Sequence, residues 1–195
     1  MLVTRSGRNA SQNESELMGF IGLLQRERVT KYCELGARHG DTFYTVMTSL
    51  PIGSTGVAVD LPGGLWGTRK SQKHLTECVE ALRVLGYKAS CLFGNSQTDA
   101  TRRLVRGRGP YDAILIDGDH TLEGVTRDWN LYRRMAPLIA FHDIVGEGQA
   151  EKVYGSPVEV PILWGSIKRT AVKDEEFIAE GSRMGIGVVH TETGS

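Results

Sequence analysis

Two short apolar segments of the sequence each end in carboxylate and imidazole side chains. Ile114–Ile116 is followed by Asp117 and His120, and residues 138–141 are followed by His142 and Asp143. Apolar, β-branched runs of this length predict buried strands, and charged groups that are costly to bury should emerge at the strand ends. Open α/β sheets bind ligands at the carboxyl ends of their strands, so we expect these side chains to meet at one rim.

A glycine-rich turn follows an earlier predicted strand. Glu34 is followed by Gly36, Ala37 and Gly40, and a helix is predicted to start at once. Glycines permit a tight turn and a close approach of backbone to a ligand, but the spacing is not the dinucleotide fingerprint Gly-x-Gly-x-x-Gly. About twenty residues later, Asp60 ends the next strand, where a carboxylate can hold both ribose hydroxyls of a nucleoside. Asp60 could also be an ordinary loop or capping residue.

Hydrophobic periodicity predicts the elements that position these residues. The predicted helices are 14–28, 41–50, 75–85, 98–105, 122–132 and 158–167. The predicted strands are 32–35, 56–60, 89–93, 114–116 and 138–141, with two late strands within 169–178 and 186–190. Asn13 and Glu16 have the spacing of a capping box at the start of the first helix.

This alternation predicts the α/β fold class, with a doubly wound, mostly parallel seven-stranded sheet and helices on both faces. The two late strands are too close in sequence to enclose a crossover helix, so we expect a C-terminal antiparallel strand pair. The chain should form a single domain, 1–195, with helix 14–28 as a cap. The segment 144–157 is rich in glycine and charge without an apolar period, which predicts a mobile lid.

Composition limits the classes of function. The 195 residues carry 23 basic and 23 acidic side chains, so the formal net charge of zero indicates neither a nucleic-acid nor a membrane surface. No apolar run is long enough to span a membrane, and residues 1–13 lack the apolar core of a secretory signal, so we expect a cytoplasmic protein. Three cysteines without metal-type spacing should be reduced. Two basic clusters, at 69–73 and 102–108, are either solvated helix faces or attract an anionic partner.

The sequence resembles the Rossmann-like (class I) S-adenosylmethionine-dependent methyltransferases, and in particular small bacterial and phage O-methyltransferase-like proteins. The resemblance spans nearly the whole chain, from about Thr30 to His190, in the arrangement of the sheet. Its most specific parts are residues 116–125, Asp128-Trp129, residues 141–144, residues 164–168 and residues 185–188.

The resemblance implies a cofactor site and an activity. The methionine part of S-adenosylmethionine would lie beside the glycine turn, at Glu34, Gly36, Ala37 and Gly40. The ribose would be held by Asp60, and the adenine would lie against Asn95 and Ser96. Asp117 would also contact the cofactor. The implied reaction is O-methylation of a small hydroxylated acceptor, in which proximity and alignment supply most of the catalysis.

The resemblance also implies a metal site at Asp117, His142 and Asp143, because metal-dependent O-methyltransferases take ligands from these strand ends. Oxygen ligands suit Mg²⁺, and a histidine favours Mn²⁺ or another transition metal. The alternative is that His142 and Asp143 only form structural hydrogen bonds. His120 is the first choice for the base that takes the hydroxyl proton, His142 the second, and a role in orienting the following helix is the alternative for His120.

Two other classes of function stay open from the sequence. One is an oxidoreductase that binds a nucleotide cofactor on a similar sheet, and the other is a catalytically silent methyltransferase-like module that binds a partner. The presence of Asp60, Asp117, His120 and Asp143 together favours an enzyme. The sequence does not name the acceptor, and a homo-oligomer stays open.

Overall fold

The computed structural model describes residues 12–64, 69–146, 152–153 and 156–191. Its helices are α1 Glu14–Arg26, α2 Asp41–Ser49, α3 Arg69–Val84, α4 Asp99–Arg106, α5 Leu122–Tyr132 and α6 Val160–Lys168. Its strands are β1 Lys31–Leu35, β2 Thr55–Asp60, β3 Lys88–Phe93, β4 Ala113–Ile116, β5 Leu138–His142, β6 Lys152–Val153, β7 Ser156–Pro157, β8 Asp174–Phe177 and β9 Ile186–His190. All the predicted helices and strands are present; β6 and β7, which pair with each other, were not predicted.

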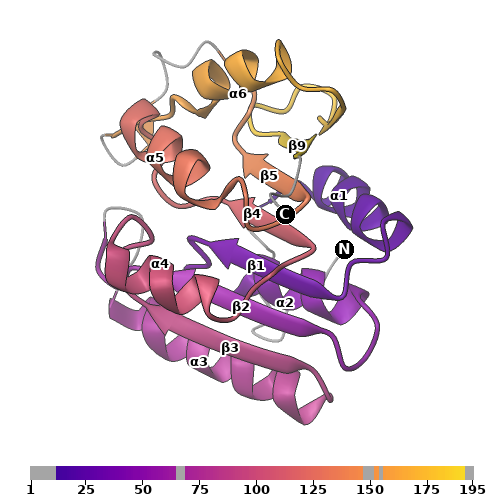
Figure 1. Ribbon diagram of the computed structural model, residues 1–195, viewed down its shortest axis with the longest axis vertical. Helices are drawn as coiled ribbons and strands as arrows, with labels where there is room; N and C mark the ends of the chain where they lie inside the picture. The colour runs from indigo at the N-terminus through magenta and orange to yellow at the C-terminus, as the bar shows by residue number, and fades with distance from the viewer. Residues whose placement is uncertain (1–11, 65–68, 147–151, 154–155, 192–195) are drawn as a thin grey trace.

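Seven of the strands form one sheet in the order β3-β2-β1-β4-β5-β9-β8 (Figure 1). The strands from β3 to β5 are parallel, whereas β9 is antiparallel to both β5 and β8. The predicted mostly parallel sheet with a C-terminal antiparallel pair is therefore confirmed. The chain leaves β1 towards β2 and later returns to β4 on its other side, and this change of direction opens a crevice at the carboxyl edge of the sheet.

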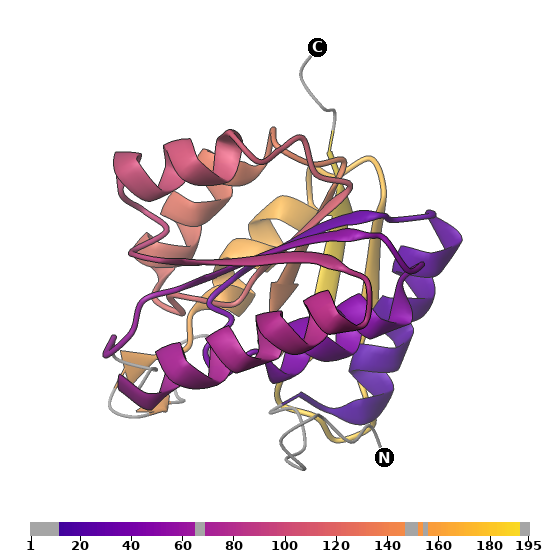
Figure 2. The same ribbon diagram turned by 90° about the horizontal axis from the view of Figure 1, so that it is seen from below.

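Helices cover both faces of the sheet, as predicted (Figure 2). The core on one face combines α1, α2 and α3 with the strands, and the core on the other face combines α4, α5 and α6. Successive strand residues alternate between the two cores: Leu115 and Ala140 face the first, whereas Ile116 and Phe141 face the second. Both faces of the central strands are buried, which explains their continuous apolar sequence.

The predicted capping box at the start of α1 is only half correct. The Asn13 side chain accepts a hydrogen bond from the Ser15 backbone N–H at 3.0 Å, so Asn13 is the N-cap. Glu16 does not complete the box, because its buried carboxylate accepts hydrogen bonds from the Ala179 N–H at 3.0 Å and the Gly185 N–H at 3.1 Å. Two backbone donors of a distant loop satisfy this carboxylate better than the helix end does.

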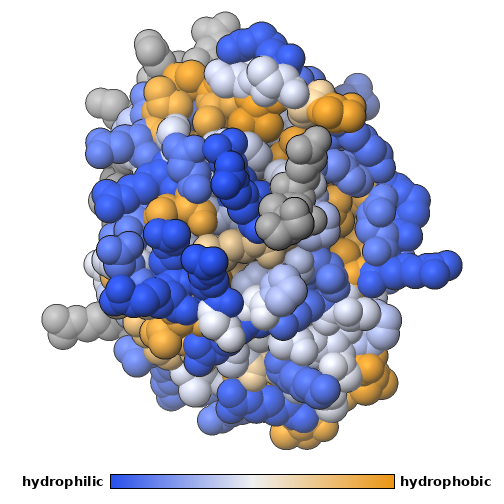
Figure 3. Space-filling view, in the orientation of Figure 1, coloured by the Kyte–Doolittle hydropathy of each residue, from blue (hydrophilic) through white to orange (hydrophobic). Residues whose placement is uncertain are grey.

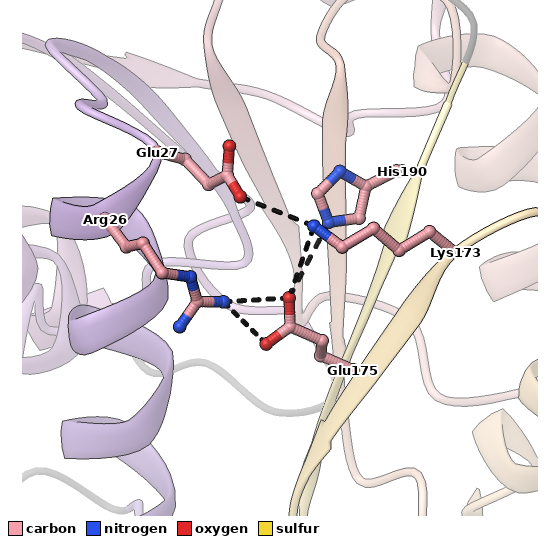
Figure 4. Close-up of polar contacts among 5 residues, drawn as sticks. All are labelled: Arg26, Glu27, Lys173, Glu175 and His190. Carbon is pink, nitrogen blue, oxygen red and sulfur yellow. Dashed lines mark hydrogen bonds and ion pairs between the residues drawn. The ribbon is translucent and has the colours of Figure 1, made fainter.

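A network of ion pairs ties the end of α1 to the β8 edge (Figure 4). Arg26 Nη2 lies 2.6 Å from Glu175 Oε2, and Lys173 Nζ lies 3.5 Å from Glu27 Oε1 and 3.7 Å from Glu175 Oε1. His190 Nε2 lies 3.8 Å from Glu175 Oε1. Two cations already neutralise the two carboxylates, so we interpret this cluster as a structural clasp that fixes the cap helix.

Hydrophilic side chains predominate on the face shown in Figure 3, with apolar ones in smaller groups. Within the described residues, no helix is long and apolar enough to cross a membrane.

Of the predicted lid at 144–157, residues 147–151 and 154–155 lie outside the described residues. At its start, Ile144 is buried and the Val145 N–H donates to the Met184 carbonyl at 2.9 Å.

Candidate active site

A cavity of about 680 Å³ lies at the carboxyl edge of the sheet, where the sequence predicted a ligand site. The turns after β1, β2, β3, β4 and β5 all contribute to its wall. Every predicted cofactor, base and metal residue lines it except Gly40. Residues outside these turns also line it; these include Gln12, Val158, Arg183 and Met184.

The glycine turn after β1 packs tightly against its neighbours. Gly36 has a φ of +90°, and a side chain there would collide with the backbone of Asp117 and Gly118. The turn is held from the other side, because the Gly36 and Ala37 N–H groups both donate to the Val59 carbonyl, at 2.8 and 3.0 Å. Gly40 lies behind the cavity as the N-cap residue of α2, where a side chain would meet Cys78 and Leu75.

Glu34 is buried at the end of β1, between the cavity and the core. The Tyr32 hydroxyl donates a hydrogen bond to Glu34 Oε2 at 2.8 Å. Burial raises the pKa of Glu34 to about 8, against the opposing effect of the Tyr32 hydrogen bond. Glu34 is therefore mostly protonated at neutral pH and can donate as well as accept a hydrogen bond.

Asp60 ends β2 with both carboxylate oxygens oriented by hydrogen bonds. The Arg38 N–H donates to Oδ1 at 3.0 Å, and the Ser71 hydroxyl donates to Oδ2 at 3.2 Å. Burial raises the pKa of Asp60, and the two hydrogen bonds oppose this change. A carboxylate oxygen can accept more than one hydrogen bond, so each oxygen can take a further donor from the cavity.

The turn after β3 presents Asn95 and Ser96 to the cavity, but their side chains also shape the turn. Asn95 Oδ1 accepts from the Gln97 N–H at 2.8 Å, which makes an Asx turn. The Ser96 hydroxyl donates to Asp128 Oδ1 at 2.8 Å, which ties the turn to α5. A ligand would therefore meet a turn whose shape is fixed in advance.

Four ionisable side chains form one cluster at the ends of β4 and β5, which are adjacent and parallel. His120 Nδ1 lies 2.8 Å from Asp143 Oδ2. His142 Nδ1 lies 3.3 Å from Asp117 Oδ1 and 3.2 Å from Asp143 Oδ1, so this imidazole is placed between the two carboxylates. The structure thus brings together all the residues for which the sequence predicted metal binding or proton transfer.

The pKa values in this cluster reflect opposite charges held close together. Burial lowers the pKa of His142, but Asp117 and Asp143 outweigh it and raise the value to about 10. The pKa of His120 is also raised, because hydrogen bonding to Asp143 and the charge of Asp117 outweigh burial. Burial would raise the pKa of Asp143, yet the two histidines lower it.

One group of side chains at metal-ligand spacing contains His120 instead of the predicted His142. Asp117, His120 and Asp143 each offer one ligand atom, and these atoms lie within 4.8 Å of one another. The predicted set has His142 in place of His120. His142 Nδ1 lies close to both carboxylates, and its Nε2 is buried without a hydrogen-bond partner.

Sequence reasoning missed several residues of the site. Gln12 Nε2 donates to Asp117 Oδ2 at 3.1 Å from just before α1, and no sequence signal marks a lone glutamine in a polar segment. Arg38 has a left-handed backbone with a φ of 48°, which aims its N–H at Asp60. Asp128 belongs to a motif of the resemblance, but its contacts can be seen only in the folded structure.

Comparison with solved structures finds the same fold in several O-methyltransferases. TomG from Streptomyces achromogenes, solved in complex with S-adenosylmethionine, superposes with a TM-score of 0.65 at 13% identity, over 94% of this chain and 82% of TomG. An O-methyltransferase from Bacillus cereus, solved in complex with S-adenosylhomocysteine, gives a TM-score of 0.63 at 14% identity, over 93% of this chain and 83% of the other.

A candidate caffeoyl-CoA O-methyltransferase from Staphylococcus aureus gives a TM-score of 0.69 at 11% identity, over 94% of this chain and 86% of the other. No protein-family model and no curated protein sequence matches the chain. These comparisons show that the chain has the Rossmann-like fold of class I O-methyltransferases.

Proposed function

We propose that this chain is an S-adenosylmethionine-dependent methyltransferase that acts on a hydroxyl group of a small acceptor. The observation that carries the proposal is that Asp60 and the cluster of Asp117, His120, His142 and Asp143 line one cavity. One cavity would then hold a carboxylate for the ribose of the cofactor and, beside it, acidic and basic groups for the acceptor. The fold shared with TomG, which was solved with S-adenosylmethionine, supports the same cofactor.

Each end of the cofactor has residues in the cavity that suit it. Asp60 has acceptor capacity left for the ribose hydroxyls, and the turn with Asn95 and Ser96 provides a wall for adenine. Gly36, Ala37 and Glu34 line the cavity at the end of β1, where the methionine part would lie. The methyl group would then face the ends of β4 and β5.

A divalent cation fits the cluster at those ends. Asp117, His120 and Asp143 supply two carboxylates and an imidazole at ligand spacing, a donor set that suits Mn²⁺ or Mg²⁺. Bound there, the cation would lower the pKa of the acceptor hydroxyl and fix its direction. His142, between the two carboxylates, would keep both turned towards the same point.

The two histidines are the candidates for accepting the hydroxyl proton. Both line the cavity, and the adjacent carboxylates raise the pKa of each. The pKa of His142 is raised to about 10, so this imidazole is protonated at neutral pH. A protonated imidazole cannot accept a second proton. A bound cation would neutralise the charges of Asp117 and Asp143, and these charges would then no longer raise the pKa of the histidines. If His120 is a ligand of the cation, His142 would be the residue left to accept the proton.

Two measurements test the proposed function. Titration calorimetry with S-adenosylhomocysteine should show binding, and incubation with S-adenosylmethionine, Mn²⁺ and a panel of phenols and sugars should release S-adenosylhomocysteine. Binding of NAD or NADP instead of either adenosyl compound would favour the oxidoreductase. Binding of the adenosyl compounds without turnover on any acceptor would favour the silent module.

A further inference from the structure

Asp128 is a fully buried carboxylate on α5 that the proposed reaction does not use. Its exposed fraction is 0%, and it does not line the cavity. Asp128 Oδ1 accepts a hydrogen bond from the Ser96 hydroxyl at 2.8 Å, and Oδ2 is buried without a hydrogen-bond partner. A buried carboxylate with so little compensation is costly, so its presence needs a reason.

The contacts of α5 suggest that reason. Besides the bond from Ser96 to Asp128, the Tyr132 hydroxyl donates to the Ser96 carbonyl at 2.6 Å. Gln97 Nε2 donates to the Gly124 carbonyl at 3.2 Å. The helix therefore holds the turn after β3 at three points, and Ser96 and Gln97 of that turn line the cavity. The shape of this wall depends on α5.

Of the three hydrogen bonds that hold the turn, only the bond from Ser96 to Asp128 involves a group that can change its charge near neutral pH. Burial raises the pKa of Asp128 most, and the charge of Asp119 in the turn after β4 also raises it. The Ser96 hydrogen bond, the nearby Gln97 amide and the charge of Arg127 lower it, and the resulting pKa is about 6. The turn after β3 faces Asp128 with the neutral side chains of Ser96 and Gln97.

We propose that Asp128 is a positioning residue for the adenine end of the cofactor, because it holds Ser96 and thereby the turn that forms the adenine wall. This inference rests on the proposed cofactor. An ionised carboxylate accepts a stronger hydrogen bond than a neutral carboxyl group, so the turn is held best when Asp128 is charged. Cofactor affinity should therefore fall as Asp128 gains a proton.

The experiment measures S-adenosylhomocysteine affinity by calorimetry on the full chain from about pH 5 to about pH 8. Asp128→Asn, which keeps the shape and removes the charge, should weaken binding about fivefold at the upper pH. The ratio of the two dissociation constants should shrink towards one at the lower pH, because the wild-type carboxyl group is then neutral too. Taking the ratio cancels the titration of the histidines around the cavity.

Two further variants guard against a merely structural effect. Ser96→Ala should weaken binding as Asp128→Asn does, and the double variant should be no weaker than either single one, because both changes break the same bond. Asp112→Asn is the matched control: Asp112 accepts hydrogen bonds from the Thr30 and Lys31 N–H groups, each at 2.8 Å, near the start of β1. This control should leave affinity unchanged at every pH.

The outcomes separate the two proposals. If the wild type does not bind S-adenosylhomocysteine, the proposed function fails and this inference fails with it. If the wild type binds but Asp128→Asn matches it at every pH, or if the affinity ratio does not change with pH, Asp128 has no such role and the proposed function stands.

Discussion

At the scale of single residues, three carboxyl groups that line the cavity lie in three different environments. Asp143 is held charged by two histidines, Glu34 is held neutral by burial, and Asp60 is buried but hydrogen-bonded at both oxygens. The neighbours of each group, rather than its residue type, decide which state prevails. Each group therefore makes a different experimental prediction.

Asp60→Ala should weaken S-adenosylmethionine binding at least about tenfold, because a charge-assisted hydrogen bond to the ribose contributes roughly 1.5–3 kcal/mol. Calorimetry measures the dissociation constant, and circular dichroism checks that the fold is kept. Asp99→Ala is the control, since Asp99 is an exposed residue of α4 paired with Arg102 at 3.8 Å. Unchanged affinity of the Asp60 variant would remove the ribose assignment.

Glu34→Gln should change how stability depends on pH. The folded-state pKa of Glu34 is about 8, above its ordinary value of 4.5, so the folded state binds the proton more tightly than the unfolded state. Its stabilising contribution is complete below the unfolded pKa and is lost as the pH rises towards 8, at up to about 1.4 kcal/mol per pH unit.

Urea unfolding of the wild type and Glu34→Gln at several pH values tests this. The wild type should lose stability relative to the variant between about pH 5 and about pH 8. If the two unfolding free energies stay parallel across this window, Glu34 is not a neutral group in the folded protein.

At the scale of elements, α1 holds the loop that carries Arg183 and Met184 to the cavity. Glu16 binds this loop at both ends, through the N–H groups of Ala179 and Gly185. The clasp around Glu175 fixes the other end of the helix. The predicted cap is thus joined to the late strands more than to the glycine turn.

Glu16→Gln should destabilise the fold by roughly 1–3 kcal/mol, because an amide has a single acceptor oxygen and one buried N–H loses its partner. Thermal unfolding measures the change. Cofactor affinity should stay within about twofold, because Glu16 does not line the cavity. Glu14→Gln, an exposed change on the same helix, should have little effect; equal losses in both variants would contradict this role.

At the scale of the whole molecule, the sheet order creates the acidic and imidazole cluster. β4 and β5 are separated by α5 in sequence but pair directly in the sheet. Strands in a sheet lie only about 4.8 Å apart, so side chains just beyond their ends meet at one point. The predicted metal site is therefore a property of the assembled sheet.

Removal of divalent cations should abolish methyl transfer, and Mn²⁺ or Mg²⁺ should restore it. Asp143→Ala should lose Mn²⁺ binding in calorimetry while it keeps its affinity for S-adenosylhomocysteine, because the cation would serve the acceptor. Glu27→Ala is the control, since it removes a carboxylate from the other acidic and histidine cluster. Full turnover in excess chelator would leave proton transfer to the histidines alone.

The sequence by itself determined the elements and the edge at which the chemistry lies. Hydrophobic period sets helix or strand locally, and a charged residue after an apolar run must leave the core, so Asp60, Asp117 and His142 could be placed at strand ends without coordinates. The spacing of the two late strands likewise fixed their antiparallel pairing.

Only the tertiary structure decided which groups share a contact. Four contacts depend on long-range packing. They are the insertion of β9 between β5 and β8, the hydrogen bonds of Glu16 to a distant loop, the approach of Gln12 to Asp117, and the grouping of His120 with Asp117 and Asp143. Such contacts join residues far apart in sequence, and no local period records them. Burial then sets the pKa of Asp128 and Glu34, because desolvation is a property of the whole fold.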